Sequence, residues 1–280
     1  MLKQRVITAL VLTALLLIVL FGATAAIFAC AMVALVLVGA WEWAGLSSCK
    51  SLWQRLLYVL FVAILLLGVG NAIGIYPFDR IELHSDVIKS ILILGCSWWA
   101  LALLLVQGYP SSVILWGHPL VRLFMGLCVL IPAWVALVYV CFQPQGAWLV
   151  LMIIGIVAAA DIGGYFAGRR YGKRKLAPHV SPGKTLEGFM GGQVSSIILA
   201  LVIAFIYHAP LGILLAIVIP TSLFSVLGDL VESMVKRHAG VKDSGVILPG
   251  HGGILDRVDS ITAAAPIFAL ALLASGWRLE

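Results

Sequence analysis

The chain has 280 residues, of which 62% are hydrophobic and 11% charged, with a formal net charge of +6 and a mean hydropathy of +1.12. A soluble domain is about half apolar and about a quarter charged, so these charges are too few to cover a water-soluble globule. A soluble nucleotide-binding sheet, a disulfide scaffold and a disordered chain are therefore excluded. Because the apolar runs lack the alternation of barrel strands, the predicted fold class is all-α, a polytopic transmembrane helix bundle.

The apolar runs predict about nine transmembrane helices, because one span needs about 20 apolar residues. The first run, 6–46, is long enough for two helices, and Gly22 is the expected break between them. The later runs predict further helices near residues 53–70, 88–107, 121–141, 147–167, 189–208, 211–231 and 254–276.

The positive charge marks one side of a membrane, because Lys and Arg collect in cytoplasmic loops. For this reason the charge does not indicate binding to nucleic acid. With the N-terminus inside, the predicted helices place every strongly basic connection in the cytoplasm, including the groups at 169–175 and 236–242. The acid-rich segment 79–86 falls outside. The sequence thus predicts a multi-pass protein of a cytoplasmic membrane.

The polar residues divide the chain into two regions. Seven of the 12 acids and ten of the 18 Lys and Arg residues lie between Asp161 and Asp259. Residues 1–145 are predicted to be a scaffold of transmembrane helices, and 146–280 a catalytic region with cytoplasmic loops 168–188 and 232–256. Acids near membrane spans are costly and mark functional sites, so the active site is expected at the cytoplasmic face.

The first polar cluster follows the apolar run 147–167. Asp161 lies inside the end of this run, and Arg169 and Arg170 come soon after it. One interpretation is a helix-end acid paired with an arginine; the other is a carboxylate that faces an interfacial cavity. Gly163, Gly164 and Gly168 would let a neighbouring backbone approach closely.

The second cluster, residues 181–188, reads SPGKTLEG. Its GKT resembles the end of a P-loop, but the upstream glycine is missing and no strand is predicted before it, so a Walker motif is rejected. Ser181 or Thr185 could cap the next helix, with Glu187 near its start. Free N–H groups there, together with Lys184 and Thr185, suit a phosphate. The alternative is a plain helix cap with a lysine at lipid-headgroup level.

The third cluster begins with Asp229, Glu232, Ser233 and Lys236, whose spacing places them on one face of a helix. Glu232 and Lys236 could also form an ordinary solvated pair. The following loop carries Arg237, Lys242, Asp243 and the segment PGHGG at 249–253.

The last predicted helix then opens with Asp256, Arg257 and Asp259. Asp256 and Asp259 share one face, although single acids there would only favour the helix dipole. Several carboxylates, no thiolates and one loop histidine indicate Mg²⁺ bound partly through substrate phosphates. Phosphoryl or nucleotidyl transfer at the boundary between membrane and cytosol is the economical interpretation.

Residues 233–259 carry the pattern S-x2-KR-x4-KD-x5-PGHGG-x2-DR-x-D. This pattern resembles the signature of phosphatidate cytidylyltransferases, the CDP-diacylglycerol synthases. The segments around Asp161 and at 181–188 also resemble that family, so the similarity covers about 155–265, while the N-terminal half is similar only as an apolar scaffold.

The resemblance implies a reaction in which CTP and phosphatidate give CDP-diacylglycerol and pyrophosphate, in the inner membrane of a bacterium. It also implies Mg²⁺ held by Asp229 and Asp256. One or two divalent ions, an additional monovalent ion and a homodimer are left open. The catalytic residues implied are Asp229, Lys236, Arg237, Lys242, Asp243, His251, Asp256, Arg257 and Asp259. The substrate-binding residues implied are Asp161, Ser181, Lys184, Thr185, Glu187, Glu232, Ser233, Gly252 and Gly253.

Several assignments stay open within this reading. Lys236, Arg237, Lys242 and Arg257 are candidates to neutralise either the triphosphate or the lipid phosphate. His251 either donates to a phosphate or packs the loop. The alternative functions are another interfacial metal-dependent lipid phosphoryl or nucleotidyl transferase, a transporter or channel, and a non-catalytic scaffold. A CDP-alcohol phosphotransferase is disfavoured because its DGxxAR pattern is absent.

Overall fold

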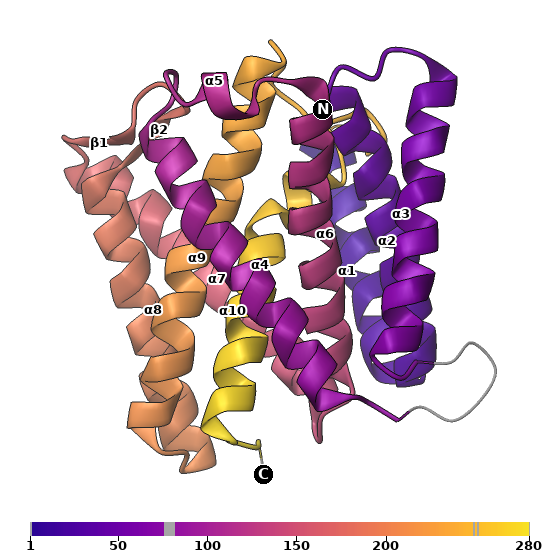
Figure 1. Ribbon diagram of the computed structural model, residues 1–280. Coiled ribbons are helices and arrows are strands. Elements are labelled where there is room, and N and C mark those ends of the chain that lie inside the picture. The colour runs from indigo at the N-terminus through magenta and orange to yellow at the C-terminus, as the bar shows by residue number, and fades with distance from the viewer. Residues whose placement is uncertain (1, 76–81, 249, 251, 280) are drawn as a thin grey trace.

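The computed structural model describes residues 2–75, 82–248, 250 and 252–279. Within these ranges the chain forms ten α-helices and one two-stranded sheet (Figure 1). In chain order they are α1 (Leu2–Gly22), α2 (Ala25–Leu46), α3 (Leu52–Ala72), α4 (Ser85–Gln107), α5 (Val113–Trp116), α6 (Pro119–Cys141), α7 (Gly146–Tyr171), β1 (Lys175–Ala177), β2 (Ser181–Thr185), α8 (Leu186–Tyr207), α9 (Leu211–His238) and α10 (Leu255–Ser275). The predicted helix bundle is confirmed.

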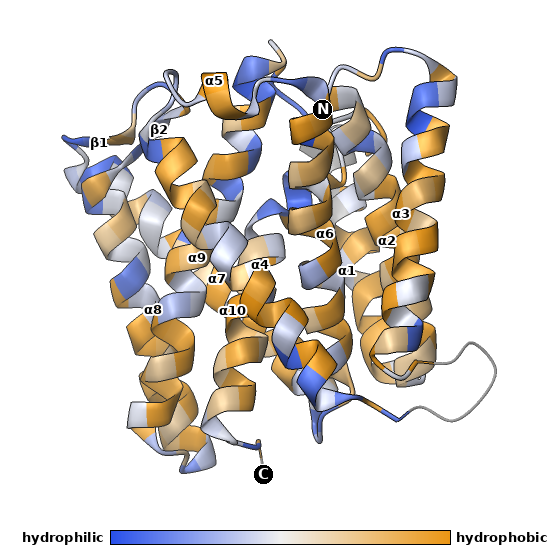
Figure 2. Cartoon of the chain, in the orientation of Figure 1, coloured by the Kyte–Doolittle hydropathy of each residue, from blue (hydrophilic) through white to orange (hydrophobic). Residues whose placement is uncertain are grey.

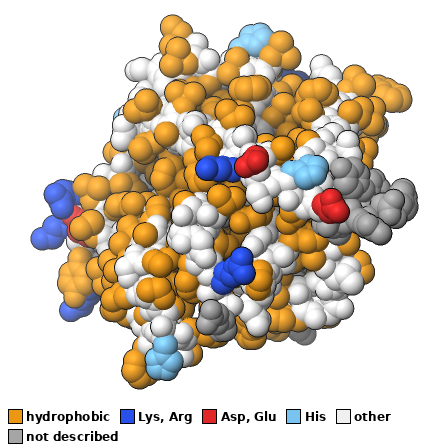
Figure 3. Space-filling view, turned by 60° about the horizontal axis from the view of Figure 1, so that its bottom comes forward, with side chains coloured by type: hydrophobic (Ala, Val, Ile, Leu, Met, Phe, Trp, Pro, Cys, Tyr) orange, Lys and Arg blue, Asp and Glu red, His pale blue; other side chains and the backbone are white. Residues whose placement is uncertain are grey.

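The helices have the length and surface of membrane spans. Among the described residues, eight helices, α2 to α4 and α6 to α10, are long and apolar enough to cross a bilayer, and α1 adds a shorter apolar stretch, Leu10–Gly22. Apolar residues run along the helices (Figure 2), and hydrophobic side chains cover most of the surface seen in Figure 3, with isolated charged groups between them. An apolar surface of this extent suits lipid rather than water, so the chain is a multi-pass membrane protein.

The predicted helix positions agree with the structure, with three differences. The break after Gly22 is confirmed, because Thr24 caps α2 by accepting a hydrogen bond from the N–H of Ile27. The short helix α5 and the β1–β2 hairpin were not predicted. In addition, α7, α8 and α9 extend beyond their apolar runs, so the connections are 172–185 and 239–254 rather than 168–188 and 232–256. In the extension of α9, the buried side chain of Lys236 forms ion pairs with Glu232 and Asp256.

The connections gather at the two ends of the bundle (Figure 1). The start of α1 and the connections 47–51, 108–118, 172–185 and 239–254 lie at one end, and 142–145 and 208–210 lie at the other. The basic groups therefore share one end, as predicted. Glu82 and Asp86, from the acid-rich segment, belong to the connection before α4 and its first turn at the opposite end, whereas residues 79–81 lie outside the described residues.

Two helix contacts position the polar clusters. α7 and α8 cross closely, because a Cβ at Gly188 would lie only 2.8 Å from the backbone oxygen of Gly164. This confirms the predicted close approach and holds the start of α8 against α7. α10 packs against α9 but begins below the level at which α9 ends (Figure 1), so the connection 239–254 folds back into the bundle. The polar start of α10 is therefore recessed from the end of the bundle.

Candidate active site

The β1–β2 hairpin presents Lys184 beside the start of α8. β1 and β2 are antiparallel, with Lys175 opposite Thr185 and Ala177 opposite Ser181. Thr185 ends β2 and caps α8, because its Oγ1 accepts a hydrogen bond from the N–H of Gly188 at 3.1 Å. Of the two predicted cap residues, Thr185 is therefore the cap. The prediction that no strand precedes this segment was wrong, since β1 precedes it and residues 181–185 themselves form β2.

Glu187 closes the base of this hairpin. Its Oε2 accepts hydrogen bonds from the N–H groups of Lys173 and Arg174 at 3.0 and 3.1 Å, and its Oε1 lies 3.0 Å from Nε of Arg174. The residue fixes the turn after α7, and its role toward a substrate stays a prediction.

A cavity of about 370 Å³ lies between α7, β2, α8 and α9. Its polar lining includes Asp161, Lys184 and Thr185, and its apolar lining includes Tyr165 and Phe189. Nζ of Lys184 lies 2.6 Å from Oδ2 of Asp229, and Asp161 interacts electrostatically with both groups. The first and second clusters therefore meet at this cavity, and Asp161 faces it as one of its two interpretations requires.

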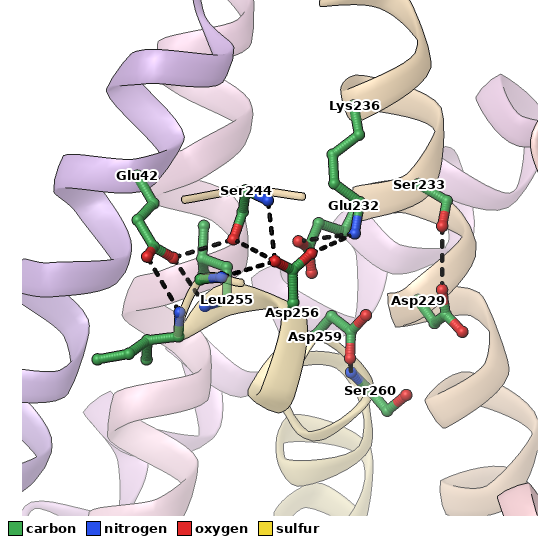
Figure 4. A network of polar contacts seen from close by, with 12 residues as sticks. Glu42, Asp229, Glu232, Ser233, Lys236, Ser244, Leu255, Asp256, Asp259 and Ser260 are labelled. Carbon is green, nitrogen blue, oxygen red and sulfur yellow. Dashed lines mark hydrogen bonds and ion pairs between the residues drawn. The ribbon is translucent and has the colours of Figure 1, made fainter. Parts of the chain in front are cut away.

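The third cluster occupies one face of α9 (Figure 4), as its spacing predicted. Oγ of Ser233 donates a hydrogen bond to Oδ1 of Asp229 at 3.0 Å. Nζ of Lys236 lies 3.2 Å from Oε1 of Glu232 and 2.6 Å from Oδ1 of Asp256. Glu232 and Lys236 are only 3% and 8% exposed, so the solvated pair considered from the sequence is wrong.

The start of α10 supplies the remaining acids. Oδ2 of Asp256 accepts hydrogen bonds from the N–H groups of Ser244 and Gly253, both at 2.9 Å, and from Oγ of Ser244 at 3.1 Å. Oδ1 of Asp259 accepts from the N–H of Ser260 at 2.7 Å, and Asp259 interacts electrostatically with Asp229 and Glu232. The structure thus brings together an acidic row from α7, α9 and α10, which consists of Asp161, Asp229, Asp259, Glu232 and Asp256.

The acidic row fits the chemistry of Mg²⁺. Its carboxylates outnumber the two lysines paired with them, and the buried Glu232 shares its lysine, Lys236, with Asp256. Buried negative charge is costly unless a cation compensates it, and hard carboxylate oxygens are ligands of Mg²⁺. Asp229 and Asp256 each contact a lysine, and no group of three or more potential ligands within the described ranges has metal-binding geometry. Mg²⁺ therefore stays a prediction.

The other predicted site residues take different places. Nε of Arg237 donates to the backbone oxygen of Val180 at 3.3 Å and so ties α9 to the hairpin. Lys242, Asp243 and Arg257 are exposed on the connection 239–254 and the first turn of α10. His251 lies outside the described residues. Ser181 lies in β2, with its side chain partly exposed.

Gly252 and Gly253 stabilise the conformation of the connection 239–254. Gly252 has a φ of +82°, a conformation that favours glycine, and its backbone oxygen accepts from the N–H of Leu248 at 2.9 Å. A Cβ at Gly253 would lie 2.6 Å from Oε2 of Glu42. The space at Gly253 therefore accommodates a carboxylate of the protein, whereas the sequence suggested that it accommodates a substrate.

The predicted site does not include Ser244, which contacts Asp256, or Glu42, which contacts Ser244 (Figure 4). Glu42 lies in the first apolar run, within the region predicted to be scaffold. A signal was present, because a single carboxylate inside a long apolar run is a functional candidate. Ser244 carried no comparable signal, since its contact with Asp256 depends on how the loop folds.

Comparisons with known proteins identify the family of this chain. The sequence profile described as the cytidylyltransferase family matches residues 3–275. The chain therefore belongs to the cytidylyltransferase family.

Individual relatives make the resemblance more specific. A protein of Pseudomonas aeruginosa named phosphatidate cytidylyltransferase is 44% identical over 280 residues, which cover 99% of each chain. One of Haemophilus influenzae with the same name is 41% identical over 284 residues, covering 96% of this chain and 98% of the relative. A third, from Staphylococcus haemolyticus, is 44% identical over 151 residues, or 52% of this chain and 58% of the relative. The resemblance to phosphatidate cytidylyltransferases is confirmed, and it extends into the N-terminal half.

Proposed function

We propose that this protein transfers the cytidylyl group of CTP to phosphatidate and releases pyrophosphate, giving CDP-diacylglycerol. The observation that carries the proposal is the pair formed by Lys184 and Asp229, which joins a cavity of about 370 Å³ to the acidic row. Similarity over nearly the whole chain to proteins named for this reaction supports the same assignment.

The reaction forms one bond and breaks one. A phosphate oxygen of phosphatidate attacks the α-phosphorus of CTP, and the bond from this phosphorus to the oxygen that bridges to the β-phosphate breaks. The electron pair leaves with pyrophosphate. Because the attacking phosphate is already anionic at neutral pH, a strong general base is not essential. Orientation of the two phosphates and neutralisation of their charge must therefore supply most of the acceleration.

The protein's own cations are placed for these tasks. Lys184 lines the cavity and is held there by Asp229. Its ammonium group can therefore exchange this carboxylate for a substrate phosphate as its ion-pair partner. Lys236 lies deeper, between Glu232 and Asp256, where it balances the charge of the acidic row. A bound Mg²⁺ would supply further neutralisation of the triphosphate, and Asp229 and Asp256, with Glu232 and Asp259 beside them, are the residues that would hold it.

The surroundings of the cavity suit a lipid substrate. Tyr165 and Phe189 line its apolar wall, and Phe166 and Met190, on the same two helices, are exposed on the lipid-facing surface. A phosphatidate in the bilayer can thus bring its phosphate to Lys184 while its chains remain among apolar side chains. We place the basic end of the bundle in the cytoplasm, where CTP is available, and the protein in a bacterial inner membrane.

The test is formation of lipid-extractable CDP-diacylglycerol from labelled CTP by the purified protein in mixed micelles with phosphatidate and Mg²⁺. We expect CTP- and phosphatidate-dependent product, and a loss of at least about a hundredfold in kcat for D229N, which removes the charge that holds Lys184. Diacylglycerol in place of phosphatidate should give no product, because it lacks the attacking phosphate. Absence of product from the folded wild-type protein would reject the proposed reaction.

A further inference from the structure

Glu42 is a buried acid outside the region in which the catalytic residues were predicted. It lies near the end of α2, one of the apolar membrane helices, and is only 2% exposed. A carboxylate in such a place is costly unless its oxygens are satisfied by hydrogen bonds or opposite charge. The partners of Glu42 therefore indicate why the acid is there.

Among the described residues, the three hydrogen-bond partners of Glu42 all belong to the site region (Figure 4). Its Oε1 accepts a hydrogen bond from the N–H of Ile254 at 3.0 Å, and its Oε2 accepts from the N–H of Leu255 at 2.9 Å. These are the first N–H groups of α10, and Ile254 at the N-cap makes no side-chain capping bond. Glu42 thus caps α10 from another helix, with its negative charge at the favourable end of the helix dipole.

The loop is shaped around this carboxylate. A Cβ at Gly253 would lie 2.6 Å from Oε2 of Glu42, and a Cβ at Gly245 would overlap with Oε1. Glycine at both positions lets the backbone approach the carboxylate on two sides. The loop and the carboxylate are therefore packed closely together, in addition to the helix cap.

Ser244 connects Glu42 to Asp256. Oγ of Ser244 lies 3.0 Å from Oε2 of Glu42 and 3.1 Å from Oδ2 of Asp256, so one hydroxyl is shared between the two carboxylates. The N–H of Ser244 also donates to Asp256. Oδ2 of Asp256, the oxygen that does not contact Lys236, is therefore oriented by Ser244, and Ser244 is in turn held by Glu42.

We propose that Glu42 is a positioning residue for the transfer reaction: it fixes the start of α10 and, through Ser244, the orientation of Asp256. This inference rests on the proposed function for its kinetic consequence, but its structural consequence can be measured without any reaction. It assigns a part in the site to α2, which belongs to the N-terminal region.

The first arm of the test is kinetic and compares E42Q with S47A. Glutamine keeps the size of Glu42 but removes its charge and one acceptor oxygen. Ser47 is a matched control, because its buried Oγ lies near the same end of α2 and has no partner among the described residues. We expect E42Q to lower kcat by about thirtyfold or more and to leave KM for CTP within about threefold, since small misplacement costs transition-state contacts while Lys184 and its cavity are untouched. S47A should stay within about twofold of wild type.

A double-variant cycle tests the route through Ser244. S244A removes the shared hydroxyl and keeps the backbone bond to Asp256, so we expect a loss in kcat of about fivefold. If Glu42 acts partly through this hydroxyl, E42Q/S244A should be no more than about twofold slower than E42Q alone. Losses that multiply fully would show independent roles and would overturn the proposed route.

The second arm measures amide hydrogen exchange of the detergent-solubilised protein without substrates. E42Q should accelerate exchange at 244 and 253–255 and leave α3, α4 and α8 unchanged. Acceleration throughout the bundle would mean that Glu42 serves the whole fold, and unchanged exchange at 253–255 would mean that it does not hold α10; either result rejects the inference. An inactive wild-type protein that still shows the local change would reject the proposed reaction and keep the structural link.

Discussion

At the scale of single residues, the informative feature is that Lys184 and Lys236 each contact a carboxylate. Lys184 contacts Asp229, and Lys236 contacts both Asp256 and Glu232. In a site that binds phosphates, such pairs keep the ammonium groups in place before the substrate arrives. The contact of Lys184 is the more accessible, because both side chains of the pair are partly exposed, whereas Lys236 is buried.

This difference leads to a prediction for K184A. An ammonium that binds only the ground state would raise KM when removed, whereas one that stabilises charge developing on the leaving group would also lower kcat. We expect the second outcome, with kcat lowered at least about tenfold, because the cavity is preorganised for added negative charge at the start of α8.

Steady-state kinetics with CTP and phosphatidate varied separately would measure the effect. K175A is the matched control, since Lys175 belongs to the same hairpin, is exposed and does not line the cavity. Values of kcat and KM for K184A within about twofold of wild type would leave Lys184 as a residue at headgroup level only.

At the scale of elements, the sequence predicts the apolar spans well and their polar extensions poorly. Hydropathy identifies the middle of every long helix, because the bilayer dictates apolar length. It cannot show that α9 continues to His238, since that extension depends on tertiary contacts such as the pair of Lys236 and Asp256. Hydropathy also does not predict the β1–β2 hairpin, because the contacts of Glu187 with the N–H groups of Lys173 and Arg174 at its base join residues far apart in sequence.

The glycine contact between α7 and α8 gives a prediction for G188A. A Cβ at Gly188 would meet the backbone oxygen of Gly164 at 2.8 Å, and a backbone atom cannot move aside cheaply. We expect the helices to separate at the cost of about 1–3 kcal/mol, which lowers Tm by several degrees and also lowers activity, because Thr185 and Lys184 move with α8.

Thermal unfolding in detergent would measure the change. G212A is the control, because nothing lies within 4 Å of a Cβ at Gly212 near the start of α9, and its Tm should not fall. An unchanged Tm for G188A would show that the close crossing of α7 and α8 contributes nothing to stability.

At the scale of the whole molecule, the shared end of the basic connections predicts the orientation in the membrane. In a cysteine-free background, single cysteines at 174 and 246 should react with an impermeant thiol reagent only from the cytoplasmic side, and cysteines at 82 and 143 only from the other. Val246 is 93% exposed and lies on the connection 239–254, outside the acidic row. The physical basis is the retention of Lys- and Arg-rich loops in the cytoplasm.

Labelling of positions 174 and 246 from opposite sides would contradict both the topology and a common site. Intact cells and inside-out vesicles serve as reciprocal controls for each cysteine, and activity of each variant shows that it is folded.

The sequence predicted the acids of α7, α9 and α10 because their spacing and their position beside apolar runs are local features. It could not predict which acid contacts which lysine. It also assigned residues 1–145 to scaffold, whereas Glu42 of α2 contacts the start of α10. That contact joins residues more than 200 positions apart, and only the packing of the helices shows it.

The contact between α2 and the start of α10 also has a consequence for biogenesis. α10 is the least apolar of the eight candidate spans and follows the others in the chain. Its first turn is stabilised in the membrane by groups that earlier helices deliver, namely Glu42 from α2 and Lys236 from α9. α2 and α9 must therefore be inserted in the membrane before α10 can reach its final position. The acidic row forms only after α10 has been translated. A ribosome-bound intermediate that lacks α10 contains the earlier membrane helices but lacks Asp256 and Asp259, so its site is incomplete.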